Sequence, residues 1–278
     1  MTLSELQRKG AQMLSEAGIE NAANEARWLL EKDSGLRSSE LLLKADETAD
    51  GGVEEKYISH ISERISGRPL QYILGSWQFY GRDFLVGEGV LIPRPETEQL
   101  CETALDFIKD IPSPAVIDLC AGSGCIGLTI AKERPDSSVL LVEKYNDALF
   151  WLRKNKEFLG ADNAAILQAD ILKADELILP RADLIVTNPP YIPSAEIPGL
   201  QSEVHYEPST ALDGGEDGVT FYRAIREISS KLGGCPVIAE CGENQSDGLN
   251  RIFGRVKMIK DFAGIERIMV YSGEANDT

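Results

Sequence analysis

Residues 115–127 read AVIDLCAGSGCIG, and this stretch decides the fold. Its first five residues form an apolar run typical of a buried strand. A glycine-rich loop follows, and a helical pattern begins near Cys125. A strand, a glycine-rich loop and a helix in this order are typical of a doubly wound α/β sheet, which binds ligands at the carboxyl ends of its strands. The sequence therefore predicts a ligand site beside residues 118–124.

The glycines of this stretch are compatible with two kinds of ligand. Gly122, Gly124 and Gly127 match the dinucleotide-binding pattern G-x-G-x-x-G, and Glu143 follows at the spacing of a ribose-binding acid. Asp118 argues against a dinucleotide, because its carboxylate would face the pyrophosphate and like charges repel. S-adenosylmethionine fits better, since it carries a cationic amino group and a sulfonium centre. A dehydrogenase is a distant alternative, as is a loop whose glycines serve only the turn.

A second motif, Asn188-Pro189-Pro190-Tyr191, ends the apolar run at residues 184–186. Prolines have no N–H to give to a sheet, and a residue before a proline is held extended, so the strand must stop here. The Asn188 side-chain oxygen and the Pro189 carbonyl could then accept the two hydrogens of a planar NH2 group. Tyr191 could stack on that group. A proline-terminated loop with a packed tyrosine is the alternative interpretation.

Predicted strands and helices alternate after residue 96, which favours a mainly parallel sheet with helices on both faces. The predicted strands are residues 115–119, 138–143, 164–168, 182–187 and 235–240, with a terminal pair at 255–260 and 267–272. The predicted helices are residues 97–109, 125–133, 146–159, 217–231 and 245–253. Asp170 and Ile171 follow the third strand and could contact an adenine ring; a solvated strand-end carboxylate is the equal alternative.

The N-terminal part of the chain has a different pattern. Apolar residues at helical spacing predict helices at 3–17, 21–34 and 53–66, which together form a small bundle. A β-hairpin with its turn at residues 81–83 is predicted next. We therefore predict three parts, which are a helical domain at 1–75, a hairpin connector at 76–95 and a Rossmann-like α/β domain at 96–278.

The charge of the chain limits its partners. The net charge is −17, and residues 86–278, with 18 basic and 31 acidic side chains, contribute −13 of it. Nucleic-acid binding draws on Lys and Arg that neutralise phosphates, so direct binding of nucleic acid is not expected. The charge favours a small-molecule or protein substrate, the latter with a basic surface.

Several other classes of protein and site are not expected. No run approaches the roughly 20 apolar residues of a membrane span. The N-terminus lacks the pattern of a signal peptide. The five cysteines show neither a disulfide framework nor a zinc-type spacing. We therefore expect a cytoplasmic, monomeric protein without a metal.

The chain resembles the release factor glutamine methyltransferases, the PrmC/HemK family, over nearly its whole length. Four motifs carry the resemblance, which are QYILG at 71–75, IPRPETE at 92–98, DLCAGSG at 118–124 and NPPYI at 188–192. Asn-Pro-Pro-Tyr is shared with amino methyltransferases that act on adenine. The Arg-Pro-Glu-Thr-Glu segment and the helical N-terminal domain are more specific to this family.

The resemblance implies a Rossmann-like methyltransferase that transfers a methyl group from S-adenosylmethionine to the glutamine amide nitrogen, N5, in the Gly-Gly-Gln motif of class 1 peptide chain release factors. The product of the cofactor is S-adenosylhomocysteine. The implied cofactor site is Asp118, Cys120, Ala121, Gly122, Ser123, Gly124, Glu143, Asp170, Ile171 and Asn188. The implied substrate site is Asn188, Pro189, Pro190, Tyr191, Arg94 and Glu96, with catalysis by Asn188, Pro189 and Tyr191. The helical domain and the hairpin would recognise the release factor.

This chain departs from the family pattern at three positions. Cys120-Ala121 stands where Gly-Thr is usual, Glu143 replaces a commoner Asp, and Ile171 stands where some relatives have an aromatic residue. Two alternatives stay open at this point. One is a nucleic-acid N6-adenine methyltransferase, which would grip its NH2 group with the same motif. The other is a catalytically silent binding module of the same fold.

Overall fold

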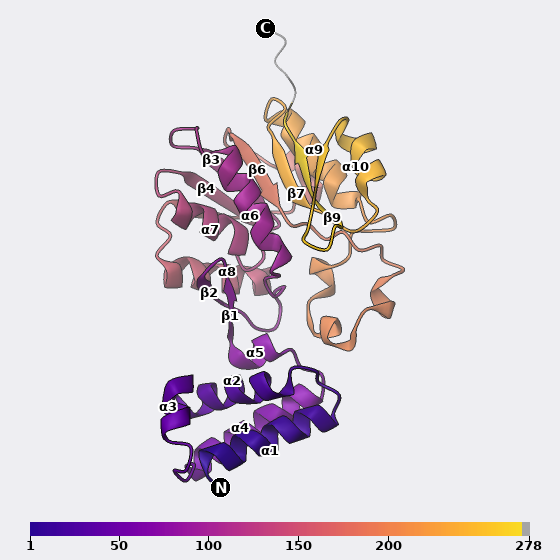
Figure 1. Cartoon of the computed structure of the whole chain (residues 1–278). Helices are drawn as coiled ribbons and strands as arrows, with labels where there is room; N and C mark the ends of the chain where they lie inside the picture. Colours follow the sequence, from indigo (N-terminus) through magenta and orange to yellow (C-terminus); the bar gives the residue numbers. More distant parts are fainter. Residues whose placement is uncertain (274–278) are drawn as a thin grey trace. The chain divides into compact units, whose positions relative to one another are not determined.

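The computed structural model describes residues 1–273, which fall into two compact units. The first unit contains Met1–Ser76 together with the distant segment Gln201–Tyr206, and the second contains the remainder (Figure 1). Among the described residues, the helices are all too short or too polar to span a bilayer.

The first unit is a bundle of helices with its own core. Its helices are α1 (Leu3–Glu16), α2 (Ala22–Ser34), α3 (Ser38–Leu43), α4 (Gly51–Ile65) and α5 (Leu70–Leu74), with the short helix η3 (Ser202–Tyr206) beside them. The spacing of apolar residues predicts α1, α2 and α4, but α3 and α5 are too short to show a period. Gly10 of α1 lets the helices approach closely, because a Cβ there would lie 2.0 Å from the Tyr57 hydroxyl oxygen.

Arg64 joins the distant segment to the bundle through an ion pair with the half-exposed Glu203. The Arg64 guanidinium donates to Glu25 at 2.6 Å and to Glu203 at 2.8 Å. Arg64 and Glu25 are buried, and removing one partner of such a pair leaves an uncompensated charge. The Tyr206 hydroxyl also donates to the Ser66 carbonyl at 3.0 Å. These contacts explain why residues 201–206 group with the first unit.

A hairpin of strands β1 (Ser76–Phe79) and β2 (Arg82–Leu85) follows the bundle. Its turn lies at Tyr80 and Gly81, which have φ values of 51° and 71°. Two successive positive φ values are typical of the tight hairpin turn that matches strand twist. The sequence-based turn at residues 81–83 was therefore one residue late, because Tyr80 is not a usual residue for this conformation.

The second unit contains a seven-stranded sheet in the order β5-β4-β3-β6-β7-β9-β8. The strands are β3 (Ala115–Leu119), β4 (Ser138–Glu143), β5 (Ala164–Gln168), β6 (Leu184–Thr187), β7 (Val237–Glu240), β8 (Lys257–Lys260) and β9 (Glu266–Tyr271). The first five in sheet order are parallel, whereas β9 and β8 close the edge antiparallel. The predicted α/β class is confirmed. The strand order reverses beside β3, and ligands bind at such a switch point in this class of sheet.

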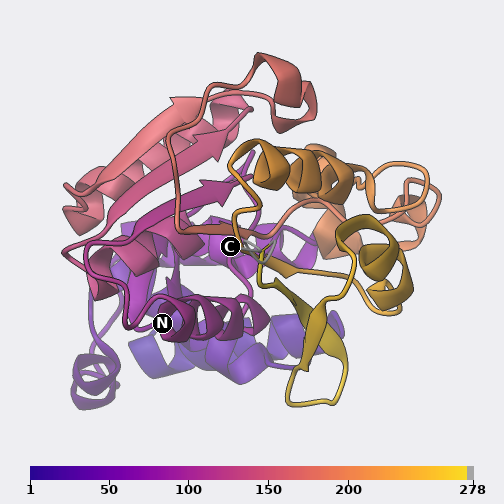
Figure 2. The same cartoon turned by 90° about the horizontal axis from the view of Figure 1, so that it is seen from above.

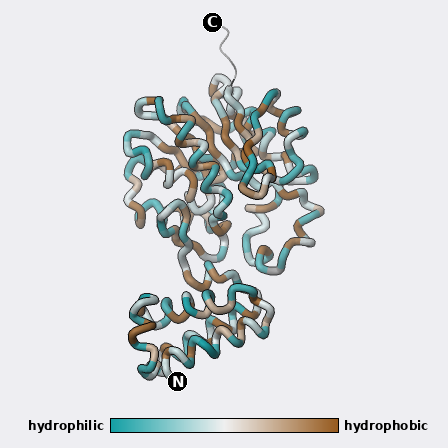
Figure 3. The backbone as a smooth tube through the Cα atoms, viewed as in Figure 1, coloured by the Kyte–Doolittle hydropathy of each residue, from teal (hydrophilic) through white to brown (hydrophobic). Residues whose placement is uncertain are grey.

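Helices cover both faces of the sheet, because successive side chains of each strand point to opposite sides. Val116 packs with α6 (Glu96–Phe107), α7 (Cys125–Glu133) and α8 (Asn146–Leu159). Ile117 packs with α9 (Thr220–Lys231), α10 (Ser246–Phe253) and the short helix η1 (Ile171–Glu176). Figure 2 shows α6 and α9 on opposite sides of the sheet, and Figure 3 shows hydrophobic residues along the strands. Two further short helices are η2 (Ile197–Gly199) and η4 (Ser209–Ala211).

Candidate active site

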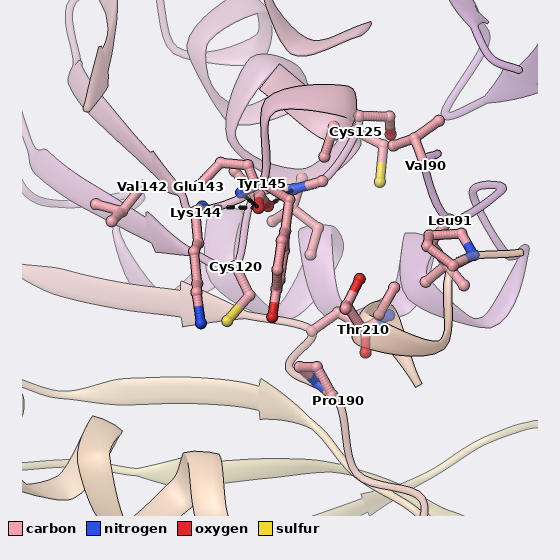
Figure 4. A pocket seen from close by; sticks show the side chains of 18 of the residues that line it. Val90, Leu91, Cys120, Cys125, Val142, Glu143, Lys144, Tyr145, Pro190 and Thr210 are labelled. Carbon is pink, nitrogen blue, oxygen red and sulfur yellow. Dashed lines mark hydrogen bonds between the residues drawn. The ribbon is translucent and has the colours of Figure 1, made fainter. Parts of the chain in front are cut away.

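A cavity lies within the second unit, at the carboxyl ends of the parallel strands. Residues that end or follow β3, β4, β5 and β6 line it, and the segment before α6 forms another wall. Figure 4 shows Glu143, Tyr145 and Cys120 on one side, with Val90 and Leu91 on the other. Cavities at this edge of an open α/β sheet are where such folds bind their ligands.

The glycine-rich loop after β3 needs unusual backbone conformations. Cys120, Gly122 and Gly124 have φ values of 59°, 56° and 83°. Glycine adopts this region freely, whereas a residue with a Cβ is strained there by roughly 1–2 kcal/mol. A Cβ on Gly124 would also lie 2.4 Å from Leu152. Cys120 therefore carries backbone strain that a glycine would not have.

The carboxylate of Glu143 organises this loop. It accepts N–H groups from Gly122 at 2.9 Å, from Lys144 at 2.7 Å and from Tyr145 at 2.8 Å (Figure 4). An ionised carboxylate has about four acceptor positions, so these bonds leave room for about one further donor. A ribose bound at Glu143 would have to use that room. Glu143 is thus a structural link between β3 and β4 as well as a lining residue.

Asp170 and Ile171 line the cavity at the end of β5. Asp170 Oδ1 accepts the N–H of Leu172 at 3.0 Å and begins η1. Its Oδ2 lies 2.9 Å from the Lys144 ammonium nitrogen. Ile171 is buried, with 4% of its surface exposed. The carboxylate is therefore not a free solvated group, because a cap and an ion pair hold it.

Asp118 lies behind the cavity wall and is fully buried. Its Oδ2 accepts the Gly127 N–H at 2.8 Å, while Oδ1 has no partner in the part of the chain that the structure describes. Burial raises the pKa of Asp118 to about 8. Gly127 is required by this approach, because a Cβ there would lie 2.8 Å from Oδ2. The third glycine of the pattern thus makes room for a carboxyl group.

A polar network holds the motif after β6. Asn188 Nδ2 donates to the Thr97 hydroxyl at 3.4 Å, and Thr97 donates to Glu240 Oε2 at 2.6 Å. The Tyr191 hydroxyl donates to Glu240 Oε1 at 3.3 Å. Thr97 and Glu240 were not among the residues predicted for the site. The available signals were the position of Thr97 inside Arg-Pro-Glu-Thr-Glu and the position of Glu240 at a strand end, like Glu143.

Burial governs the ionisation of this network. It raises the pKa of Glu240, and hydrogen bonds from Thr97 and Tyr191 together with the charge of Arg267 act in the opposite direction. Burial and the neighbouring Glu240 raise the pKa of Tyr191 well above its ordinary value. Tyr191 therefore stays a neutral hydrogen-bond donor rather than a base.

The chain beyond Tyr191 is fixed by its neighbours. Gln245 Nε2 donates to the Tyr191 carbonyl at 2.9 Å and to the Gly218 carbonyl at 3.2 Å. The N–H of Gly214 donates to the Ile192 carbonyl at 2.8 Å. A Cβ on Gly214 would lie 2.8 Å from the Tyr191 backbone, so this glycine permits the close approach. The loop that carries the motif is consequently held on several sides.

The two residues assigned from the Arg-Pro-Glu segment have different surroundings. Arg94 lines the cavity and forms an ion pair with Glu207. Glu207 is buried and also accepts the Ile92 N–H at 3.1 Å. Glu96 is exposed at the start of α6 and lies outside the cavity lining.

The structure brings most of the predicted site residues to one cavity. Those that line it are Arg94, Cys120, Ala121, Gly122, Ser123, Glu143, Asp170, Ile171, Asn188 and Pro190. Those that do not line it are Glu96, Asp118, Gly124, Pro189 and Tyr191. Within residues 1–273, no group of three or more His, Cys, Asp or Glu side chains is placed to hold a metal ion.

Comparison with known families gives two matches along the chain. The family model "PrmC N-terminal domain" matches residues 5–75, and "Methyltransferase small domain" matches residues 101–202. A release factor glutamine methyltransferase of Bacillus subtilis is 37% identical over 282 residues, which cover 96% of this chain and 96% of that protein. One of Geobacter sulfurreducens is 37% identical over 265 residues, covering 92% of this chain and 91% of that protein.

A solved structure is similar in fold. The catalytic domain of hMettl16, crystallised in complex with a 3′UTR hairpin, superposes with a TM-score of 0.58 at 16% identity. The match covers 79% of this chain and 84% of that one. At this low identity, the structural similarity supports the methyltransferase fold alone.

Proposed function

The chain belongs to the family of release factor glutamine methyltransferases, and from that premise we propose that it methylates the side-chain amide nitrogen, N5, of the glutamine in the Gly-Gly-Gln motif of class 1 peptide chain release factors. The methyl donor is S-adenosylmethionine. The observation that carries the proposal is the Asn188 carboxamide, which stands in the cavity with its oxygen free. In the part of the chain that the structure describes, neither Asn188 Oδ1 nor the Pro189 carbonyl accepts a hydrogen bond.

The residues around the cavity fit S-adenosylmethionine. Cys120 to Ser123 would hold its methionine end, Glu143 its ribose, and Asp170 with Ile171 its adenine. A Cβ on Gly122 would have no neighbour within 4 Å, so this side of the loop is open to a ligand. Asp118 Oδ1 has no hydrogen-bond partner among the described residues, and a cationic ligand bound nearby would favour the ionised form of this carboxyl group. The bound cofactor supplies an electrophilic methyl group on its sulfonium centre.

The chain's own residues act on the acceptor nitrogen. A carboxamide nitrogen is a weak nucleophile, because its lone pair is delocalised into the carbonyl. Asn188 Oδ1 and the Pro189 carbonyl accept its two hydrogens and fix the direction of the lone pair. Alignment of this kind can supply several kcal/mol of the barrier. A strong base is not required at this nitrogen, since the nitrogen becomes far more acidic when it is alkylated.

The bundle and the hairpin would recognise the release factor. The support is the match of residues 5–75 to the PrmC N-terminal domain. The net charge of −17 favours a basic surface on that partner.

One incubation tests the proposed function. The full chain is mixed with S-adenosylmethionine labelled in its methyl group and with a class 1 release factor. The matched control is the same release factor with the glutamine of Gly-Gly-Gln replaced by Ala. Label in the first protein alone is the expected result, and equal label in both would refute the acceptor.

Two further samples address the alternatives. Label in duplex or single-stranded DNA at low salt, but not in the release factor, would favour an adenine methyltransferase. Calorimetric titration with S-adenosylmethionine addresses the silent module, since the absence of binding heat together with the absence of label would favour that alternative.

A further inference from the structure

The carboxamide of Asn188 can take two orientations in the same space. Rotation by a half turn exchanges its oxygen, which accepts hydrogen bonds, with its NH2 group, which donates them. Only the oxygen can hold the NH2 group of an acceptor amide, because two donors repel each other. The two orientations have almost the same shape, so packing alone cannot select between them. A hydrogen-bonding neighbour is needed to decide.

Thr97 is that neighbour, and its single hydroxyl proton decides the orientation of the Asn188 carboxamide. A threonine hydroxyl has one proton to give and lone pairs with which to accept. Its proton goes to Glu240 Oε2, which accepts it at 2.6 Å. The remaining lone pairs of the Thr97 hydroxyl oxygen can only accept a hydrogen bond. They accept one from Asn188 Nδ2, which lies 3.4 Å away. Asn188 Oδ1 must then be on the other side of the carboxamide.

Glu240, which accepts the Thr97 proton, is itself held in place by its neighbours. Glu240 is 4% exposed, and its other oxygen accepts the Tyr191 hydroxyl at 3.3 Å. The Tyr222 hydroxyl donates to the Glu240 backbone carbonyl at 2.6 Å and holds the end of β7. Burial and the charge of Glu96 raise the pKa of Glu240, while the hydrogen bonds from Thr97 and Tyr191 and the charge of Arg267 act in the opposite direction. Thr97 is 1% exposed, so water does not compete for its proton.

We propose that Thr97, anchored by Glu240, is a positioning residue that turns Asn188 Oδ1 towards the acceptor amide. The proposal rests on the function proposed above, in which that oxygen holds the glutamine nitrogen. It assigns a task to the threonine of the Arg-Pro-Glu-Thr-Glu segment, whose side chain would not touch the substrate. Without the hydroxyl, the carboxamide populates both orientations and loses its fixed direction.

The test uses Thr97→Val, which keeps the shape of the side chain and removes the hydroxyl. We expect kcat for release-factor methylation to fall about tenfold or more, since small misplacements of reacting groups cost this much or more. The Kd for S-adenosylmethionine should stay within about twofold, because the change affects the acceptor step. Thr97→Ser keeps the hydroxyl and should restore most of the lost rate.

Thr129→Val is the matched control. Thr129 is also fully buried in the second unit, and its hydroxyl has no hydrogen-bond partner among the described residues. The same chemical change there should leave kcat unchanged. Urea unfolding of each variant separates loss of fold from loss of rate, and Thr97→Ala replaces Thr97→Val if the latter does not fold.

Two outcomes would overturn the proposal. One is a kcat for Thr97→Val equal to that of the wild type, and the other is an equal loss in Thr97→Ser and Thr97→Val. In both outcomes the wild-type chain still methylates the release factor, so the proposed function would not be refuted. Absence of methylation by the wild-type chain would instead refute the proposed function, and the role of Thr97 with it.

Discussion

The two sides of the cavity are held in different ways. On the side of β3 to β5, backbone N–H groups fix the carboxylates, with bonds of 2.7 to 2.9 Å to Glu143 and 3.0 Å to Asp170. On the side of β6 and β7, other side chains hold Asn188 and Tyr191 through longer bonds of 3.4 and 3.3 Å. On the first side most of these N–H groups follow the carboxylate directly in sequence, and only Gly122 reaches Glu143 from the neighbouring strand. The second side depends on side chains brought together by the sheet.

This difference teaches which changes each side tolerates. A backbone-held carboxylate is part of the fold, so its replacement should cost stability and cofactor affinity together. A carboxamide held by side chains can be changed with little effect on the fold, so its replacement should cost rate. Variants on the two sides should therefore differ in whether they lose stability and cofactor affinity or lose rate alone.

The largest effect is expected for Asn188→Ala. Loss of the acceptor oxygen should lower kcat about 100-fold or more, because the amide nitrogen loses its alignment. The Kd for S-adenosylmethionine should change by less than about threefold. Steady-state kinetics with a release factor and calorimetry give the two numbers. Asn250→Ala, an exposed position on α10, should behave as wild type. An unchanged kcat for Asn188→Ala would contradict the proposed role of Asn188 in holding the acceptor amide.

Glu143→Gln should damage the other side in a different way. The carboxamide has one oxygen for three N–H donors, and its own NH2 group would face at least one of them. Leaving a partly buried donor unpaired costs about 1–3 kcal/mol of the free energy of unfolding. The affinity for S-adenosylmethionine should fall by about tenfold or more. Urea unfolding and calorimetry measure both losses, and a variant as stable as the wild type would contradict the role of this carboxylate.

Asp118→Asn should change how stability depends on pH. Burial raises the pKa of Asp118 in the folded chain to about 8, whereas the unfolded value is about 4. The stabilising contribution of its neutral form is complete below pH of about 4 and is lost as the pH rises to about 8. The variant keeps an oxygen for the Gly127 N–H and does not titrate.

The free energy of unfolding of Asp118→Asn should therefore improve relative to the wild type between pH of about 5 and 8. The improvement should reach up to about 1.4 kcal/mol per pH unit, the value for one proton. Urea titrations at several pH values test this. A constant difference between the two chains would show that this carboxyl group titrates normally.

Cys120→Gly should give the smallest effect. The residue has a φ of 59°, which costs a side chain about 1–2 kcal/mol, while glycine loses about 0.5–1 kcal/mol through its flexibility in the unfolded chain. A net gain of about 0.5–1 kcal/mol is expected in urea unfolding, with little change in cofactor affinity. A loss of stability would mean that packing of the Cys120 thiol outweighs the backbone strain.

The fold was predictable where the pattern is long and local. The bounds of β3, β4 and β5 match the sequence-based strands to the residue. The predicted strands at 182 and 235 begin two residues before β6 and β7 do. Proline at 236 has no N–H for a ladder, and the Asp183 side chain instead accepts the Ala115 N–H at 2.9 Å. The short helices α3 and α5 gave no periodic signal.

The cavity lining was predictable where it lies in contiguous motifs. The segments after β3, β4, β5 and β6 supply most of the predicted residues that line the cavity. By contrast, Thr97 and Glu240 are 143 residues apart and meet through the packing of α6 on β7. Neither residue type nor spacing identifies such a pair without the order of the strands.

The most direct measurement is a crystal structure of the chain with S-adenosylhomocysteine and a class 1 release factor. We expect the glutamine amide nitrogen of Gly-Gly-Gln to lie about 3 Å from both Asn188 Oδ1 and the Pro189 carbonyl oxygen. Asn188 Nδ2 should still donate to the Thr97 hydroxyl. A glutamine side chain bound in the cavity without contact to either oxygen would refute the proposed role of Asn188 and Pro189.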